Sequence, residues 1–395
     1  MKRIKRANII FMVSILSVFF LIPNVYAQQK SDVVVKEWRI PTIFFLSGPL
    51  AGFGLPTKWL AEEVAKDISA AGGIAGRPVV LDFCDSALDP TKATACISKA
   101  IDSKAVCMLG PLHETEMKGA MSLAVREGIF SFSGTATDEI VKQFYPWTIS
   151  TIPPIEESNT YQMRLWIKHE PDIKSVVAFE DPTTRIAILQ NRGFLTELGN
   201  QGKETKGAIE IPSGMTDYTP IVVRALGTKA NAFIIGAPAD TAALIVKGLV
   251  SRGVNPKHIY LQVIAFNAAF LEIAKGFNEG VYFASSLTYS PYPEYMKYLK
   301  EYMETHGGQP WGPFTHYAYD MLKMIKLAIE NTGVTGDPVK VKEERIKIKD
   351  YAINQKNFQG LQATYDVVNG LVVRHPQRIF QLRSNEAVLV EEFRP

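Results

Sequence analysis

The sequence has 395 residues, with 43 Lys and Arg against 40 Asp and Glu, so its formal net charge is +3. Charges this closely balanced give no electrostatic basis for binding nucleic acid. At this length we expect two domains of ordinary size.

Residues 1–27 have the composition of a signal peptide. Four basic residues precede an uncharged apolar stretch over 9–22, and Val25-Tyr26-Ala27 supplies the small residues that signal peptidase reads. Cleavage there removes four basic residues and no acidic one, which lowers the net charge from +3 to −1. We expect a periplasmic protein whose mature chain does not insert into the membrane, since no second long apolar run follows. No cysteine lies near the cleavage site to carry a lipid anchor.

Residues 38–77 predict a strand, a loop and a helix. The apolar run over 40–46 breaks at Ser47-Gly48-Pro49, and a glycine-rich turn with Gly52 and Gly54 precedes apolar residues at helical spacing. Such a unit binds small ligands at the carboxyl end of its strand. The loop lacks the Gly-Lys-Ser/Thr ending of a phosphate-binding loop.

From residue 78 onward, predicted strands alternate with predicted helices, which is typical of parallel sheets covered on both faces. The segment 147–154 interrupts the alternation, so we expect two similar α/β lobes joined near Pro153. The first series has strands over 78–83, 105–109 and 129–132 and helices over 89–101, 114–126 and 138–144. The second has strands over 176–179, 207–211, 232–235, 259–263 and 281–284 and helices over 161–169, 186–198, 218–225 and 241–252.

The last hundred residues change in character. Residues 289–331 are predicted to be helical between prolines, and the basic run 340–349 indicates a solvated helix face. Four short strands over 364–368, 372–375, 379–382 and 388–391 then close the fold as antiparallel strands, with Asn369-Gly370 as a hairpin turn.

Three cysteines, Cys84, Cys96 and Cys107, fall within 24 residues. In an oxidising compartment this number predicts one disulfide and one buried thiol. Their places on the predicted elements favour Cys84 with Cys96 over the other pairings. Their spacing matches no zinc motif.

Five segments resemble the leucine/isoleucine/valine-binding protein family, the type I periplasmic solute-binding proteins of ABC transporters. They are SGPLAGFG (47–54), AGGIAGRPVVLDFCDSALDPTKATACI (71–97), AVCMLGPLHET (105–115), SGTAT (133–137) and NFQGLQATYDVVNG (357–370). The resemblance implies an α/β fold of two Rossmann-like lobes with parallel sheets, joined by a three-strand hinge. Lobe one would span 33–153 plus 287–356, and lobe two 154–286 plus 357–395.

The resemblance also implies which residues face the cleft. In this family the loops after strands one, three and four of the first lobe hold the carboxylate and ammonium of an amino acid. Here those positions carry Phe53, His113, Glu114, Thr115, Ser133 and Thr135. The second lobe places Arg185 where an aromatic residue is usual, with Pro238 and Asn267 in later loops and no clear acid for an ammonium. Trp311, in a loop rich in proline and glycine, is a further candidate.

Two of these residues point to the class of ligand. Glu114 facing the cleft would repel the carboxylate of an amino acid held in the usual way. The second lobe offers Arg185 and no clear acid for an ammonium, which suggests a ligand with a carboxylate and no amine. The alternative is that Arg185 pairs with Glu180 or Asp181 at the surface. Trp59, at helical spacing with Leu60, is predicted to belong to the core.

We therefore predict a monomeric binding protein that captures a small organic solute, amino acid-like or a carboxylate, in a cleft between the lobes and delivers it to an inner-membrane ABC permease. It would need no cofactor and no metal. One alternative is a ligand sensor of the same fold that feeds a signalling partner. Another is an enzyme that uses His113 and Glu114 as an acid–base pair, although no nucleophile motif accompanies them.

Overall fold

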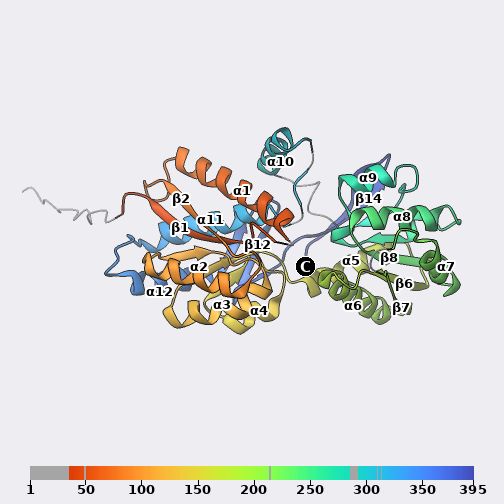
Figure 1. The fold of residues 1–395 in the computed structure, drawn as a ribbon, viewed down its shortest axis with the longest axis horizontal. Coiled ribbons are helices and arrows are strands. Elements are labelled where there is room, and N and C mark those ends of the chain that lie inside the picture. Colours follow the sequence, from red (N-terminus) through yellow and green to blue (C-terminus); the bar gives the residue numbers. More distant parts are fainter. Residues whose placement is uncertain (1–34, 49, 213–214, 285–291, 309, 313) are drawn as a thin grey trace, which may run out of the picture. The chain divides into compact units, whose positions relative to one another are not determined.

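The computed structural model describes residues 35–395, except 49, 213–214, 285–291, 309 and 313. The predicted signal peptide lies outside these residues. The described chain forms a five-stranded, a seven-stranded and a three-stranded sheet, with helices packed around the two larger ones (Figure 1). The predicted α/β class with parallel sheets is confirmed.

The first sheet is entirely parallel, with the strand order β2-β1-β3-β4-β5. Its apolar side chains, such as Ile40 and Phe132, are fully buried. The strands are β1 (Trp38–Phe44), β2 (Val79–Asp85), β3 (Cys107–Leu109), β4 (Phe130–Ser133) and β5 (Thr148–Ser150). The helices that pack with them are α1 (Ala51–Ala70), α2 (Pro90–Asp102), α3 (Glu114–Glu127), α4 (Asp138–Phe144), α11 (Tyr317–Thr332) and α12 (Val341–Ala352).

The second sheet has the order β15-β14-β10-β9-β8-β6-β7. Five strands are parallel, and β14 and β15 add an antiparallel edge. Its strands are β6 (Ser175–Glu180), β7 (Glu204–Glu210), β8 (Ala232–Gly236), β9 (Ile259–Leu261), β10 (Tyr282–Phe283), β14 (Gln377–Arg383) and β15 (Glu386–Phe393). The helical elements of this region are α5 (Ile155–His169), α6 (Arg185–Asn200), α7 (Thr219–Gly227), α8 (Ala239–Val250), η1 (Pro256–His258), η2 (Val263–Ala265) and α9 (Ala268–Ile273).

A small antiparallel sheet follows α12. It consists of β11 (Gln355–Gln359), β12 (Thr364–Val368) and β13 (Leu371–Val373), and the predicted Asn369-Gly370 turn joins the last two. The sheet lies against β5, since the amide of Ser150 donates to the carbonyl of Gly370 at 2.9 Å. The predicted lobe boundary at residue 357 therefore falls inside β11. The separate helix α10 spans Pro293–Thr305.

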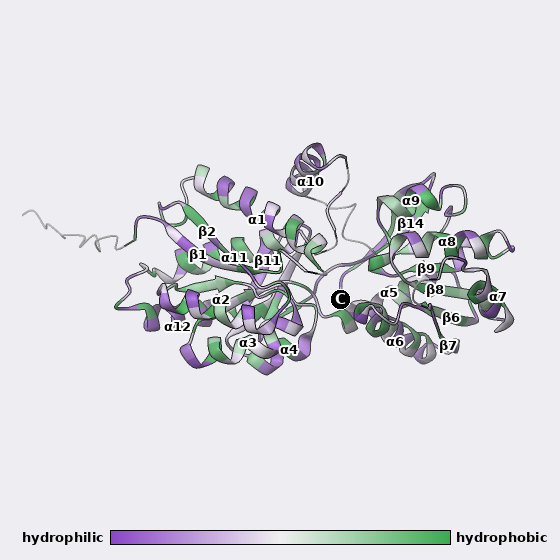
Figure 2. Ribbon diagram, viewed as in Figure 1, coloured by the Kyte–Doolittle hydropathy of each residue, from purple (hydrophilic) through white to green (hydrophobic). Residues whose placement is uncertain are grey.

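Local sequence signals explain several helix ends. Asp89 caps α2 by accepting from the amides of Thr91 and Lys92 at 2.7 and 2.9 Å, and Pro90 occupies the first helical position. Gly128 ends α3 in the left-handed conformation with φ of 64°. Figure 2 shows hydrophilic and hydrophobic residues side by side on the helices, as expected where one face packs on a sheet.

The predicted glycine-rich turn at Gly52 and Gly54 is wrong, because α1 already begins at Ala51. A Cβ at Gly54 would lie 2.0 Å from the carbonyl oxygen of Phe45, so only glycine allows the helix to start this close to the chain leaving β1. The segment 147–154, predicted only to interrupt the alternation, contains a strand of the first sheet, β5.

The predicted pairing of cysteines is confirmed. Cys84 and Cys96 form a disulfide that ties β2 to α2. Cys107 is a buried free thiol, and burial raises its pKa to about 12, so it stays protonated and unreactive. Within the described residues, no helix combines the length and apolar character that crossing a bilayer requires.

Candidate functional site

The loops that follow the carboxyl ends of β3 and β4 hold several predicted residues. His113 caps α3: its Nδ1 accepts from the amide of Thr115 at 3.2 Å, and the carboxylate of Glu116 accepts from the amide of His113 at 3.1 Å. Glu116 also accepts from the Ser86 hydroxyl and is fully buried, and burial raises its pKa to about 7. This capping box fixes the direction in which α3 leaves the sheet.

Glu114, the first residue of α3, forms an ion pair with Arg185, the first residue of α6. Glu114 Oε1 lies 2.8 Å from Arg185 Nε, and Glu114 Oε2 accepts from the Thr137 hydroxyl at 2.8 Å. The Glu114 side chain is 7% exposed, whereas that of Arg185 is 61% exposed. Both carboxylate oxygens are therefore occupied, while the guanidinium reaches solvent. The alternative pairing of Arg185 with Glu180 or Asp181 is not found.

The two Nη atoms of Arg185 have no bonding partner among the described residues. A guanidinium presents its donors in a planar fork that matches the two oxygens of a carboxylate. Arg185 can therefore hold Glu114 through Nε and still offer two Nη donors to a second anion. This is the strongest anion-binding feature of the loops.

His113 lies beside this pair. Its ring packs edge-on against Phe45, with centroids 6.3 Å apart. Burial is the main cause that lowers the pKa of His113; Arg185 and Lys118 act in the same direction and Glu114 opposes them. Because Nδ1 accepts a hydrogen bond, the neutral ring carries its proton on Nε2 and can donate it.

Ser133, the last residue of β4, and Thr135, in the loop that follows, are both buried. The Ser133 hydroxyl donates to the carbonyl of Pro111 at 2.8 Å, which ties this loop to the one after β3. The Thr135 hydroxyl accepts from the amide of Thr137 at 3.4 Å, and the carbonyl of Thr135 accepts from the Ser150 hydroxyl at 2.5 Å. These bonds position Thr137 to hold Glu114.

The remaining candidates take no part in the ion pair. The Thr115 side chain is exposed, and Pro238 and Asn267 are exposed residues that precede α8 and α9; Asn267 caps α9 by accepting from the amide of Phe270 at 3.1 Å. Phe53 is half-buried in α1, close to Gly312.

Trp311 is 1% exposed and belongs to an aromatic cluster. Its ring centroid lies 6.4 Å from that of Trp59, 5.4 Å from Tyr295 and 5.8 Å from Tyr302, and its Nε1–H donates to the Tyr295 hydroxyl at 3.3 Å. The half-buried Trp59 packs against this core, as predicted.

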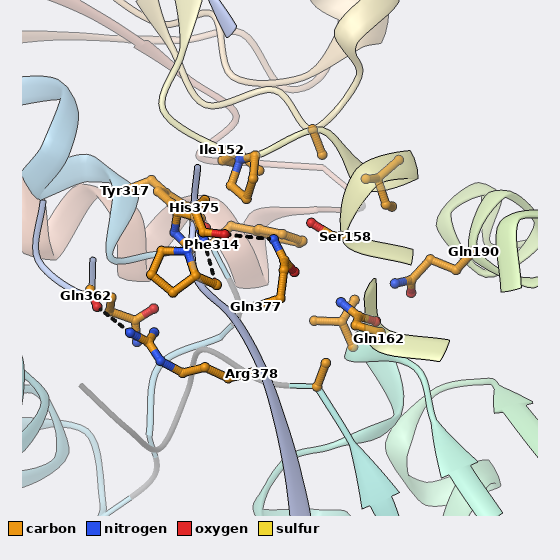
Figure 3. A pocket seen from close by; sticks show the side chains of 16 residues that line it. Ile152, Ser158, Gln162, Gln190, Phe314, Tyr317, Gln362, His375, Gln377 and Arg378 are labelled. Atoms are coloured by element: carbon orange, nitrogen blue, oxygen red, sulfur yellow. Dashed lines mark hydrogen bonds between the residues drawn. The ribbon is translucent and has the colours of Figure 1, made fainter. Parts of the chain in front are cut away.

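A pocket of about 110 Å³ lies among the chain segments that connect the two larger sheets, including the one that leads from β5 into α5 and the one that leads from β13 into β14 (Figure 3). Ser158, Gln162 and Gln190 lie on one side and Phe314, Tyr317 and His375 on the other. Gln190 is 3% exposed, and its Oε1 has no hydrogen-bond partner among the described residues. The space is smaller than the roughly 300–1,000 Å³ of sites that enclose drug-sized ligands. It suits a small polar group.

The sequence analysis missed these pocket residues. Burial lowers the pKa of His375 to about 4, so its ring is neutral near pH 7. The available signal was the presence of the amides Gln162 and Gln190 on helices that also bury apolar residues, since a buried amide requires a partner.

Comparisons with known proteins agree with this architecture. A family model described as "Periplasmic binding protein" matches residues 37–384. The leucine-specific-binding protein of Salmonella typhimurium is 22% identical over 324 residues, which cover 79% of this chain and 84% of that protein. The Leu/Ile/Val-binding protein of Citrobacter freundii is 20% identical over 316 residues, covering 78% and 82%. The predicted resemblance is thereby confirmed.

A solved structure shares the fold. The branched-chain amino acid transporter substrate binding protein of Streptococcus pneumoniae, solved with isoleucine, superposes with a TM-score of 0.69 at 20% identity. The match covers 91% of this chain and all of that one.

Proposed function

Because this chain belongs to the periplasmic binding protein family, we propose that it is the solute-binding component of an ABC uptake system. It captures a small organic solute in the periplasm and delivers it to an inner-membrane permease. The relatives above are themselves named as binding proteins, which supports binding over catalysis.

The choice of solute rests on one observation: Arg185 pairs with Glu114 through Nε and leaves its two Nη donors unpaired among the described residues. The charge of Glu114 is already balanced by Arg185, and its second oxygen accepts from Thr137, so Glu114 is a weaker partner for the ammonium of an amino acid than an unpaired carboxylate would be. Arg185 keeps two Nη donors for a carboxylate, and the Nε2–H of His113 is a neutral donor nearby. The proposed solute therefore carries a carboxylate and does not require an amine.

Arg185 follows the second sheet and Glu114 the first, so a solute held by both loops would link the two regions. We assign 33–153 plus 287–373 to one lobe and 154–286 plus 374–395 to the other, because β11, β12 and β13 form one sheet that contacts β5 and α11. A solute that bonds to both favours the closed population, which the permease then recognises.

A matched set of solutes tests the ligand class. Purified chain is titrated calorimetrically with leucine, with 4-methylpentanoate, which is leucine without its ammonium, and with 3-methylbutylamine, which has no carboxylate. Phenylalanine and 3-phenylpropanoate repeat the comparison for an aromatic side chain. We expect the carboxylates to bind more tightly than the matching amino acids and the amine not to bind. Tight leucine binding together with weak 4-methylpentanoate binding would contradict the proposal.

The role of Arg185 is tested with Arg185→Gln. We expect at least a tenfold loss of carboxylate affinity, because a charge-assisted hydrogen bond is worth about 1.5–3 kcal/mol. Arg192→Gln is the matched control, since Arg192 is exposed on the same helix. Glu114→Gln should retain binding or tighten it, because it removes the anion that competes for Arg185. Equal losses in the Arg185 and Arg192 variants would exclude Arg185 as a contact.

A further inference from the structure

A second group of chemically active side chains lies at the amino-terminal ends of strands in the seven-stranded sheet, opposite to the ends that Arg185 follows. Glu170 ends α5, Asp172 lies in the turn before β6, and His258 is the last residue of η1, just before β9. One ligand atom from each lies within 4.8 Å of the other two. The group sits where strands begin, whereas Arg185 follows the end of β6.

His258 has a tautomer that suits metal binding. Its Nδ1 lies 2.9 Å from the carbonyl oxygen of Asn231, which can only accept, so Nδ1 carries a proton. Nε2 faces the Asp172 carboxylate at 3.2 Å. In a neutral ring the lone pair of Nε2 would point at the Asp172 carboxylate and repel it. The close approach is favourable only when a cation lies between the two groups or Nε2 carries a proton. A backbone carbonyl that orients the imidazole is the usual support of a metal ligand.

Glu170 brings a second carboxylate to the group. The residue is 9% exposed, and its Oε1 accepts from the Tyr282 hydroxyl at 2.8 Å. Within the described part of the chain, Oε2 has no partner, and neither Lys nor Arg pairs with Glu170 or Asp172. Oε2 is not enclosed, so a cation can reach it, and binding one would balance a charge carried by a largely buried residue.

The surrounding backbone is fixed. The Asn231 side chain accepts from the amides of Lys174 and Ser175 and donates to the carbonyl of Asp172 at 2.9 Å. The same residue therefore holds the turn that carries Asp172 and, through its carbonyl, the ring of His258. The 65% exposed side chain of Asp172 is the part that can move.

We propose that Glu170, Asp172 and His258 form a binding site for one Zn²⁺ ion, with water completing the coordination. Two carboxylates balance the double charge, and one imidazole with two carboxylate oxygens is a ligand set that zinc accepts. Tetrahedral zinc with bonds of about 2.0–2.2 Å holds its donors about 3.3–3.6 Å apart. The three ligand atoms, which lie within 4.8 Å of one another, must therefore draw closer, and the exposed Asp172 side chain can rotate to allow this. The ion would join the turn before β6 to η1.

Zinc binding to the full, untagged chain is measured by calorimetry with ZnCl₂ after EDTA treatment. We expect one ion per chain, a higher Tm with ZnCl₂ than with EDTA, and at least tenfold weaker binding in Glu170→Gln and in His258→Gln. His306→Gln is the matched control, because His306 is exposed and lies outside the cluster. Asp172→Asn, at an exposed position, covers the case in which the buried variants do not fold.

Two results would overturn the site. One is the absence of both heat and Tm shift with ZnCl₂, which would mean that His258 and Asp172 only pair with each other. The other is zinc binding that Glu170→Gln and Asp172→Asn leave unchanged or that His306→Gln weakens equally, which would place the ion elsewhere. The outcome is independent of the solute titrations, because Arg185 follows the carboxyl end of a strand of this sheet, whereas His258 precedes the amino-terminal end of another.

Discussion

The loops that follow the carboxyl ends of the strands differ between the two larger sheets in how they hold their side chains. After β3 and β4, Glu114, Ser133 and Thr135 are buried and hydrogen-bonded. After β6, Arg185 is exposed and pairs through Nε alone. The difference indicates that one region supplies a fixed surface, whereas the other supplies a side chain free to follow the solute, so that less ordering entropy is lost on the fixed side.

Two further features distinguish the first region. The start of α1 lies against the chain leaving β1 at Gly54, and the Cys84–Cys96 disulfide closes a short loop beside it. The second region has no cysteine. The predictions below test whether these features make the first region rigid.

The largest effect is expected for Gly54→Ala. The added methyl would lie 2.0 Å from a backbone oxygen that cannot move freely, so the free energy of unfolding should fall by about 4 kcal/mol. Urea denaturation measures the change. Gly52→Ala in the same helix meets nothing within 4 Å and should be neutral or gain up to about 1 kcal/mol. Similar losses in both variants would show that helix α1 as a whole, and not this contact, is sensitive.

Removing the disulfide should cost somewhat less. For a loop whose ends are 12 residues apart, loss of the cross-link in the Cys84→Ser, Cys96→Ser double variant should lower the unfolding free energy by about 3 kcal/mol. Denaturation of the oxidised wild type and of the double variant gives the difference. Solute affinity should be unchanged, because Cys84 and Cys96 lie outside the group around Arg185. A loss of affinity would show that the fixed surface depends on the cross-link.

The smallest effect is a change in pH dependence. Burial raises the pKa of Glu116 from 4.5 to about 7, so between these values the folded chain binds a proton that the unfolded chain has released. This group therefore makes stability fall as the pH rises from about 4.5 to 7. Glu116→Gln mimics the protonated acid and should flatten the slope in that window relative to wild type, as followed by Tm. Parallel curves for both proteins would mean that Glu116 stays ionised.

Sequence patterns predicted the elements that have local signals. Asp89-Pro90 and Gly128 marked helix ends because caps act through neighbouring residues. Gly52 and Gly54 were misleading, because the need for glycine there comes from Phe45, a residue of the preceding segment that the fold brings into contact. The three-residue strand β5 is too short for a periodic pattern.

The site could be predicted residue by residue but not as an arrangement. Glu114 and Arg185 were each singled out, yet acids adjacent in sequence were the expected partners of Arg185, and Asp181 instead accepts from Thr183. Arg345 shows the same limit: it lies in the basic run predicted to be solvated, but it is 3% exposed and donates to the carbonyls of Ala105 and Glu127. Composition cannot tell which member of a charged run turns inward.

The outer strands of the seven-stranded sheet have a consequence for the protein at high concentration. β7 carries Glu204, Lys206 and Glu210, and β15 carries Glu386, Glu391 and Glu392. An unpaired strand edge is a template for another chain, and charges along it oppose that pairing. Two copies meeting edge to edge at β15 would have to desolvate these acids together with the cations Lys168, Arg378 and Arg394 that pair with two of them. The charged residues of the two outer strands, β7 and β15, thus disfavour fibrous association of copies through the sheet.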